Sequence, residues 1–329
     1  MATYKGIKGV KVQTKASDPT ASEATGTVWY NSTGDALKYS IAGPGAWASG
    51  GALNTGTRQM GLTGIQTAAI KMSGGNTYIL NCETYNGSTW TEVADVNTGA
   101  DYNVAFGTSA AAVYCGGTDG SVRDETETWN NTSWSASPGT MNTARMKMSA
   151  ANQGTTTDGL IFAGMAVPAP TTPGVQVTES WNGTSWAEEA DLNTGRSAGG
   201  GGGTSTAAFL ASGYRGPAGM TTVVETWNGT SWTEVNPVNS TRQGAGSSGT
   251  TTSALFYAGT VPPVSALTEK YDGTSWTEVA DLATAREGVG KGTGIDGGSG
   301  LCVGFDGSPN TIVEEFNDPV YTIKTVTVS

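Results

Sequence analysis

The stretch Glu225-Thr-Trp-Asn-Gly-Thr-Ser-Trp232 decides the fold, because it recurs along the chain with few changes. Asn-Gly or Asp-Gly between two aromatic positions favours a hairpin turn, since such a turn needs positive φ. The final tryptophans follow one another at intervals of 44 to 52 residues, and a period of about 40 to 50 residues is typical of four-stranded propeller blades. The other copies are Glu83-Thr-Tyr-Asn-Gly-Ser-Thr-Trp90, Glu127-Thr-Trp-Asn-Asn-Thr-Ser-Trp134, Glu179-Ser-Trp-Asn-Gly-Thr-Ser-Trp186 and Glu269-Lys-Tyr-Asp-Gly-Thr-Ser-Trp276.

Two further strands are expected upstream of each hairpin. In the copy that ends at Trp232 they fall at roughly 197–203 and 206–213, and each second strand ends in glycine. The equivalent second strands are expected at 110–116, 159–164, 253–259 and 300–304. The first strands are introduced by Arg58, Ala100, Arg145, Arg196, Arg242 and Arg286. Four short strands per repeat, with 49 glycines in the chain, predict an all-β fold.

An arginine before the first strand, a glycine after the second, an aromatic residue in the third and a tryptophan in the fourth resemble the kelch repeat. The resemblance covers about residues 47 to 321. It departs from the repeat where the glycine pair is single, because both glycines are clear only at Gly74-Gly75 and Gly116-Gly117. The resemblance implies a kelch-like β-propeller. Its repeated residues would be structural, namely the five arginines together with Trp90, Trp134, Trp186, Trp232 and Trp276.

Six starts of a first strand predict six blades. Two segments compete to supply the last strand of the ring. Tyr321 follows Phe316 at the spacing that separates the aromatic pair in the other hairpins, and Trp47 lies in a similar context near the amino end. If the Trp47 segment belongs to a further blade, the propeller has seven blades; we favour six. The expected division is an amino-terminal arm and hairpin at 1–46 and a propeller at 47–329.

The amino-terminal segment carries a second resemblance. Gly26-Thr-Val-Trp-Tyr-Asn31, Leu37-Lys-Tyr39 and Gly45-Ala-Trp47 resemble a short hairpin element common in bacteriophage tail and fibre proteins. This implies a virion structural protein, made in the host cytoplasm and placed in the virion as part of a homo-oligomeric or symmetric assembly. Residues 1–16 would be an extended arm that binds other virion proteins by β-strand addition.

Composition argues against several functions. The chain has no histidine, so it lacks the commonest general base and metal ligand; we predict no catalysis, no metal and no cofactor. This excludes the copper chemistry of galactose-oxidase-like kelch proteins. A sialidase-like hydrolase is disfavoured, because the turn at Asn228 has Asn for the expected Asp and is one residue short, and because the repeated arginines occupy one position per blade.

Net charge and cysteine content limit the classes of partner and the cellular compartment that we expect. The net charge of −11 and the pI of about 4.5 argue against nucleic-acid binding. No apolar run is long enough for a membrane span, and no signal peptide is visible at the start. Cys82, Cys115 and Cys302 lack metal-site spacing and are expected to be buried free thiols.

Function is therefore expected in variable loops on a rigid scaffold. The loops between the second and third strands vary most, and we select Asp119, Met165, Tyr214 and Arg215 as candidate binding residues. The favoured hypothesis is attachment of a virion to a host-surface ligand such as a glycan or a protein receptor. The alternative is a purely structural decoration or connector subunit that contacts only other virion proteins.

Overall fold

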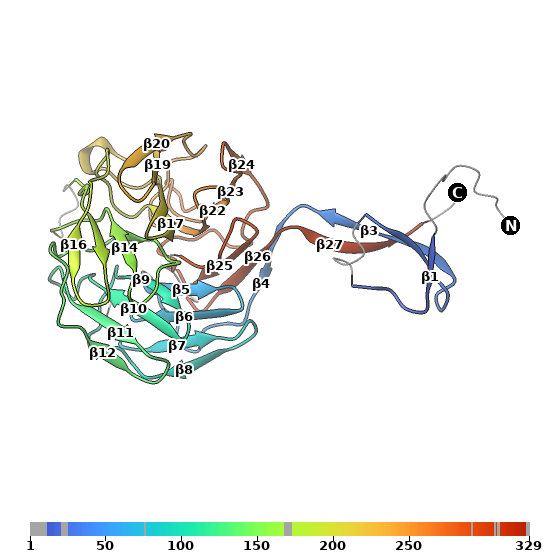
Figure 1. The fold of residues 1–329 in the computed structure, drawn as a ribbon, viewed down its shortest axis with the longest axis horizontal. Helices are drawn as coiled ribbons and strands as arrows, with labels where there is room; N and C mark the ends of the chain where they lie inside the picture. Colours follow the sequence, from blue (N-terminus) through green and yellow to red (C-terminus); the bar gives the residue numbers. More distant parts are fainter. Residues whose placement is uncertain are drawn as a thin grey trace. The chain divides into compact units, whose positions relative to one another are not determined.

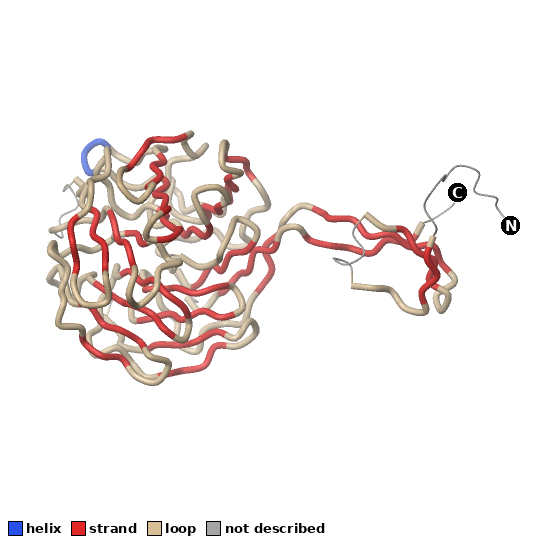
Figure 2. Tube along the Cα trace, in the orientation of Figure 1, coloured by secondary structure: helices blue, strands red, loops and turns tan. Residues whose placement is uncertain are grey.

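The computed structural model describes residues 12–20, 26–75, 77–167, 173–290, 292–305, 307 and 310–326. The chain forms two compact units. The larger unit comprises Ala46–Asn317, and the smaller one comprises Met1–Gly45 together with Asp318–Ser329. Among the described residues the regular structure is almost all strand, as Figure 2 shows, with one short 3-10 helix at Gly216–Ala218.

The larger unit is a β-propeller of six blades (Figure 1), as the sequence predicted. The first blade consists of β5 (Gly61–Ile65), β6 (Ala68–Met72), β7 (Cys82–Tyr85) and β8 (Trp90–Val93). The second consists of β9 (Val104–Thr108), β10 (Ala111–Cys115), β11 (Thr126–Trp129) and β12 (Trp134–Ala136). The third consists of β13 (Ser149–Ala150), β14 (Gly159–Phe162), β15 (Thr178–Trp181) and β16 (Trp186–Glu188). The fourth blade consists of β17 (Gly200–Thr204), β18 (Ala207–Ala211), β19 (Val224–Trp227) and β20 (Trp232–Val235). The fifth consists of β21 (Gly246–Gly249), β22 (Ala254–Tyr257), β23 (Thr268–Tyr271) and β24 (Trp276–Glu278).

The sixth blade joins the two ends of the propeller unit. β25 (Ser299–Val303) pairs with β26 (Val313–Asn317), and β26 pairs antiparallel with β4 (Ala46–Ser49). Trp47 lies opposite Phe316 in this register, so it occupies the tryptophan position of the blade. Tyr321 belongs instead to β27 (Val320–Thr325), which pairs with β3 (Ala36–Gly43). The amino-terminal segment therefore closes the ring, and the two candidates for closure are resolved in favour of Trp47.

The smaller unit is a separate sheet of order β1-β2-β3-β27, with β1 (Gln13–Lys15) and β2 (Val28–Asn31). The expected hairpin is present as β2 and β3. The expected division at 47–329 differs from the structure at its carboxyl end, because residues from Asp318 onward belong to the smaller unit. Most of the expected arm at 1–16 lies outside the described residues, and β1 is the part of it that is described.

Each hairpin between third and fourth strands is held by its Asn or Asp. Asn228 accepts hydrogen bonds from the amides of Thr230 and Ser231, at 3.0 and 2.9 Å. The same pair of bonds occurs at Asn86, Asn130, Asn182 and Asp272. The following residue has positive φ, for example 91° at Gly229 and 71° at Asn131. This local chemistry explains why the eight-residue pattern is so regular.

Buried arginine–glutamate pairs fasten four of the six linkers to the blades that follow them. Arg196 contacts Glu225 on β19, and both side chains are fully buried. Glu225 also accepts the linker amides of Asn193 and Thr194. Equivalent pairs join Arg145 to Glu179, Arg242 to Glu269 and Arg286 to Glu314. The strand and the incoming linker are thus held by one carboxylate.

Arg58 does not occupy the equivalent position, contrary to the expectation from the sequence. The fully buried residue at that position is Thr57, and Arg58 comes one residue later and is half-buried. In this blade the cation beside the equivalent glutamate, Glu83, is Lys71 on β6, at 3.5 Å. The sequence register was therefore wrong by one residue at the first linker.

The single glycines after the second strands also have a geometric reason. Two successive residues there take positive φ, and the first of them is often not glycine: Ala163 has φ 63° and Ser212 has φ 58°. The second residue stays glycine because its neighbours are close. A Cβ on Gly213 would lie 2.7 Å from the carbonyl oxygen of Ser197. The kelch pattern is therefore broken at the first position of the glycine pair, where a side chain still fits, and kept at the second.

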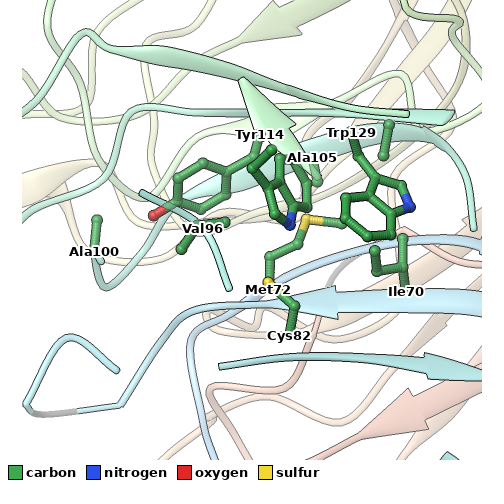
Figure 3. Packing of buried hydrophobic residues seen from close by; sticks show 10 residues of the cluster. Ile70, Met72, Cys82, Val96, Ala100, Ala105, Tyr114 and Trp129 are labelled. Atoms are coloured by element: carbon green, nitrogen blue, oxygen red, sulfur yellow. The ribbon is translucent and has the colours of Figure 1, made fainter. Parts of the chain in front are cut away.

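The buried hydrophobic side chains of the described residues form six clusters, one at each interface between neighbouring blades. Figure 3 shows the first, in which Ile70 and Met72 of β6 pack against Tyr114 and Trp129 of the next blade. The cluster that contains Leu301 and Tyr85 joins the sixth blade to the first. Blade-to-blade packing therefore runs around the whole ring, and each blade keeps only short sheet edges.

A hydrogen bond crosses some of these interfaces and is missing from others. The indole Nε1 of Trp186 donates to Thr126, that of Trp232 to Thr178 and that of Trp47 to Thr268, each at 2.9 Å, in the preceding blade. The indole nitrogens of Trp134 and Trp276 are buried and have no hydrogen-bond partner among the residues that the structure describes. The preceding blades carry Cys82 and Val224 at the threonine position.

Replacing Val224 by Thr should therefore stabilise the propeller. The new hydroxyl would accept from Trp276 Nε1, and a buried donor without a partner costs about 1–3 kcal/mol. We expect the free energy of unfolding to rise by about 1 kcal/mol, measured by chemical denaturation. The matched control Thr178→Val should lower it by about 1–3 kcal/mol, because it removes the partner of Trp232. Destabilisation by both substitutions would contradict this explanation.

Candidate functional site

Six linker residues form a closed ring at one face of the propeller. Five of them come just before the first strand of a blade, Gly288 stands at the equivalent position of the three-stranded sixth blade, and all have φ between 53° and 65°. Their backbones are joined head to tail by amide-to-carbonyl hydrogen bonds of 2.6–3.0 Å. The ring, in bonding order, is Gln59, Gly288, Gly244, Ala198, Lys147, Tyr102 and back to Gln59. A ring with one member per blade must surround the propeller axis.

A cavity of about 170 Å³ lies at this ring. Three ring members carry long side chains, Gln59, Tyr102 and Lys147, whereas the other three are Ala198, Gly244 and Gly288. The three small residues leave empty the space that long side chains would fill at their positions. The remaining lining residues are Met60, Asn103, Gln243, Glu287 and Val289. We call this space the axial cavity.

Charges at the axial cavity are close to balanced. Lys147 Nζ lies 4.5 Å from the centre of the Tyr102 ring. Burial lowers the pKa of Lys147, with Glu287 opposing the shift, and burial raises the pKa of Glu287 against the nearby charges of Arg58 and Lys147. Burial also raises the pKa of Asp101 to about 7, and Arg58 opposes that shift. Two cations thus lie near two carboxyl groups.

Three acceptor oxygens at or beside the axial cavity have no hydrogen-bond partner in the described part of the chain. They are Gln59 Oε1, Asn103 Oδ1 and Asp101 Oδ1. Asn103 and Asp101 are each only 5% exposed. Buried polar groups in native proteins are nearly always bonded, so each exception calls for an explanation. These three oxygens are inaccessible to solvent, and that of Asn103 faces Gly61 on β5, so they lie behind the surface of the axial cavity.

The candidate loop residues lie outside the axial cavity, and the structure does not bring them together. Asp119 is exposed and forms an ion pair with Arg123. Arg215 is exposed, and Tyr214 is half-buried with its backbone bridged to Ser197. Met165 is 3% exposed and bridged to Met146, so the expectation that it contacts a surface ligand does not fit its burial.

The axial residues were missed in the sequence because no motif marks them. Their signal is positional: the ring member stands two residues after each arginine-equivalent position, as Lys147 does after Arg145. That position varies from Gly to Tyr among the blades, as a position freed from packing does. The one-residue error at Arg58 hid Gln59 from the same comparison.

The described residues show neither an activated thiol nor a cluster of metal ligands. The three cysteines are buried and unpaired. Burial raises the pKa of Cys82 to about 12, and it raises those of Cys115 and Cys302 as well, so thiolates are scarce at neutral pH. No group of three or more Cys, Asp or Glu that could hold a metal ion occurs in this part of the chain. Nor does any helix there have the length and apolarity needed to cross a bilayer.

Comparison with known proteins supports the fold assignment and nothing beyond it. No family model matches the chain, and no curated protein matches it. Among solved structures, one titled "Structure of YjhT" superimposes with a TM-score of 0.66. It is 11% identical, and the match covers 83% of this chain and 99% of the other. At this identity the likeness is one of fold, and it agrees with a β-propeller.

Proposed function

We propose that this chain is a non-catalytic attachment protein of a bacteriophage virion, in which the propeller binds a ligand on the host surface. The observation that carries the binding role is the axial cavity, which is lined by residues from several blades at a face built from loops on a rigid scaffold. The phage context rests on the sequence resemblance of residues 26–47 to tail and fibre hairpins. Binding without turnover is supported by the absence of histidine from the sequence and by the buried thiols.

The smaller unit supports an anchoring role. The chain enters the propeller at Ala46 and leaves it after Asn317, at the point where the other blades have their turn between third and fourth strands. Both ends of the propeller unit therefore continue into one small sheet. Asp18, an exposed residue in the loop after β1, accepts hydrogen bonds from Trp29 at 3.0 Å and from Asn31 at 2.7 Å. A module of this kind can bind other virion proteins while the propeller stays free for a ligand.

Attachment is tested with the purified full chain. The labelled protein is applied to a panel of bacterial cells and to a glycan array, and the supernatant is assayed for released reducing sugar. We expect saturable binding to one cell surface with no released sugar. Release of sugar that a single acidic substitution abolishes would establish an enzyme instead. Tight co-purification with capsid or tail proteins, without binding to cells or glycans, would establish the purely structural alternative.

A further inference from the structure

Lys71 is a charged exception in the interior of the first blade. On β6 it lies opposite Leu62 of β5 and Glu83 of β7, and its side chain is fully buried. In each of the other five blades the residue paired with the equivalent glutamate is uncharged. These residues are Tyr114, Ile161, Leu210, Phe256 and Cys302. The first blade therefore places an amine where its neighbours have no nitrogen.

The Lys71 amine also contacts a carboxamide, that of Asn81 just before β7. Nζ donates to the backbone carbonyl of Asn81 at 3.2 Å and lies 3.5 Å from Glu83 Oε1. It donates to Asn81 Oδ1 as well, which places the nitrogen beside the Cγ carbon of that side chain. The equivalent residues of the other blades carry no carboxamide; they are Glu125, Val177, Val223, Leu267 and Ile312. Amine and carboxamide thus occur together in one blade, and in contact.

The surroundings of this pair favour a reaction between its two members. An unprotonated amine is a nucleophile, and a buried lysine gives up its proton more readily. Burial lowers the pKa of Lys71, and the charge of Glu83 opposes the shift. The Glu83 carboxylate is close enough to take that proton. The Asn81 nitrogen lies on the solvent side, because Nδ2 donates to Glu92 at 2.8 Å in an exposed hydrogen bond.

We propose that Lys71 and Asn81 join through a side-chain amide bond in the folded protein, with Glu83 as the proton carrier. The bond between Lys71 Nζ and Asn81 Cγ forms, and the bond between Cγ and Nδ2 breaks. Of the three hydrogens on the Lys71 ammonium, one stays on the new amide nitrogen. The other two pass by way of Glu83 to the leaving nitrogen, which departs into solvent as ammonium. Atoms and charge balance without an oxidant, a metal or a cofactor.

The amide bond would tie β6 to β7 in a blade whose linker lacks the arginine pair, since Thr57 stands at that position. After the reaction Glu83 keeps the linker amides of Asn54 and Thr55, each at 2.9 Å. Glu127 accepts linker amides in the same way in the second blade, where no ion pair reaches it from the described residues. A buried carboxylate held by amides alone is therefore compatible with this fold. The inference concerns the covalent structure of the propeller and is independent of the proposed attachment role.

Mass spectrometry of the purified full chain tests the bond. We expect a mass about 17 Da below that of the sequence, which is the mass of ammonia. Lys71 is the one site for trypsin between Arg58 and Arg123, and acylation blocks it, so residues 59–123 should appear as one peptide. Chymotrypsin cleavage after Tyr78 should then leave the fragments that contain Lys71 and Asn81 joined. Tryptic cleavage after Lys71 into two unlinked peptides would overturn the proposal.

Two variants that copy other blades assign the bond to its residues. Asn81→Val introduces the side chain found at Val177, and Lys71→Leu introduces the one found at Leu210, so the fold should tolerate both. Each variant should have the full mass of its own sequence, and Asn81→Val should also regain tryptic cleavage after Lys71. A mass loss that persists in either variant would contradict the assignment.

A control separates the amide bond from succinimide formation, which also releases ammonia. The nearest Asn-Gly pair is Asn86-Gly87. Asn86→Asp removes this pair and keeps a turn residue that Asp272 provides in the fifth blade. We expect the mass loss and the blocked trypsin site at Lys71 to remain in this variant. Their disappearance would place the loss of ammonia at the turn and refute the bond.

Glu83→Gln tests the proton carrier, because it keeps amine and carboxamide but cannot accept the proton. General acid–base groups typically contribute about 100-fold or more to a rate, so the cross-linked fraction in freshly synthesised, folded protein should grow about 100-fold more slowly. Cross-linking at the parent rate would refute the role of Glu83. Should this variant not fold, the peptide map of the parent chain and Asn81→Val decide the amide bond by themselves.

Discussion

Replacement of Glu225 by Gln should destabilise the propeller by about 3–5 kcal/mol. Arg196 and Glu225 are both fully buried and in contact, and removing one partner leaves the other charge buried without compensation. The Glu225 carboxylate also accepts the amides of Asn193 and Thr194 at the entry to the fourth blade. A loss of this size is a large part of the 5–15 kcal/mol that typically stabilises a folded protein. Denaturant unfolding measures it directly.

The chain supplies a matched control for this prediction. Glu127 occupies the same position in the second blade and accepts the amides of Asn97 and Thr98 in the same way. The linker there carries Ala100 in place of arginine, and no ion pair reaches Glu127 from the described residues. Glu127→Gln should therefore cost no more than about 1–2 kcal/mol, since the amide hydrogen bonds weaken but no buried cation loses its partner. Equal losses in the two variants would show that the ion pair is not the source of the effect.

Replacement of Trp47 by Ala should open the ring and cost about 3 kcal/mol. The Trp47 ring packs 5.0 Å from that of Tyr257 and 5.3 Å from that of Phe316, and its indole nitrogen donates to Thr268 in the preceding blade. Truncation removes this packing and loosens β4, the strand that covers the edge of β26. An uncovered edge promotes association between chains. We expect a lower unfolding midpoint and concentration-dependent aggregation by light scattering.

Tyr321→Ala distinguishes the two candidates for closure. Tyr321 lies on β27, whose backbone pairs with β3 rather than with β26. The propeller transition should therefore change by less than about 0.5 kcal/mol, the usual range for a substitution that leaves an element untouched. Tryptophan fluorescence is a suitable readout, because Trp29 is the one tryptophan outside residues 46–317. A larger loss in Tyr321→Ala than in Trp47→Ala would reverse the assignment of the closing strand.

The repeated strands, the turns and the number of blades could be predicted from the sequence. These features depend on residues that are close together in the sequence. Asn228 and Gly229 fix their own turn, and Trp227 and Trp232 mark the two strands that flank it. Because the same local chemistry recurs in other units, six repeats imply six blades. The resemblance to the kelch repeat added the architecture into which such units assemble.

What the sequence left open depends on residues far apart in the chain. Trp47 and Tyr321 are both compatible with a fourth strand locally, and only the pairing of β4 with β26 and of β27 with β3 decides between them. The one-residue shift that places Thr57 rather than Arg58 beside the first blade appears only when the six linkers are compared in space. Lys71, the cation that replaces the arginine there, comes from another strand of the blade.

The axial cavity is the clearest case of a feature that only the tertiary structure decides. By itself the sequence determined a six-bladed β-propeller, because each blade's turns and strands follow from neighbouring residues. Gln59, Tyr102 and Lys147 are up to 88 residues apart, and no local pattern links them. They meet because six linkers converge on one axis and bond to one another. Ring closure is a collective result of blade packing, so the site it creates becomes visible only in the folded molecule.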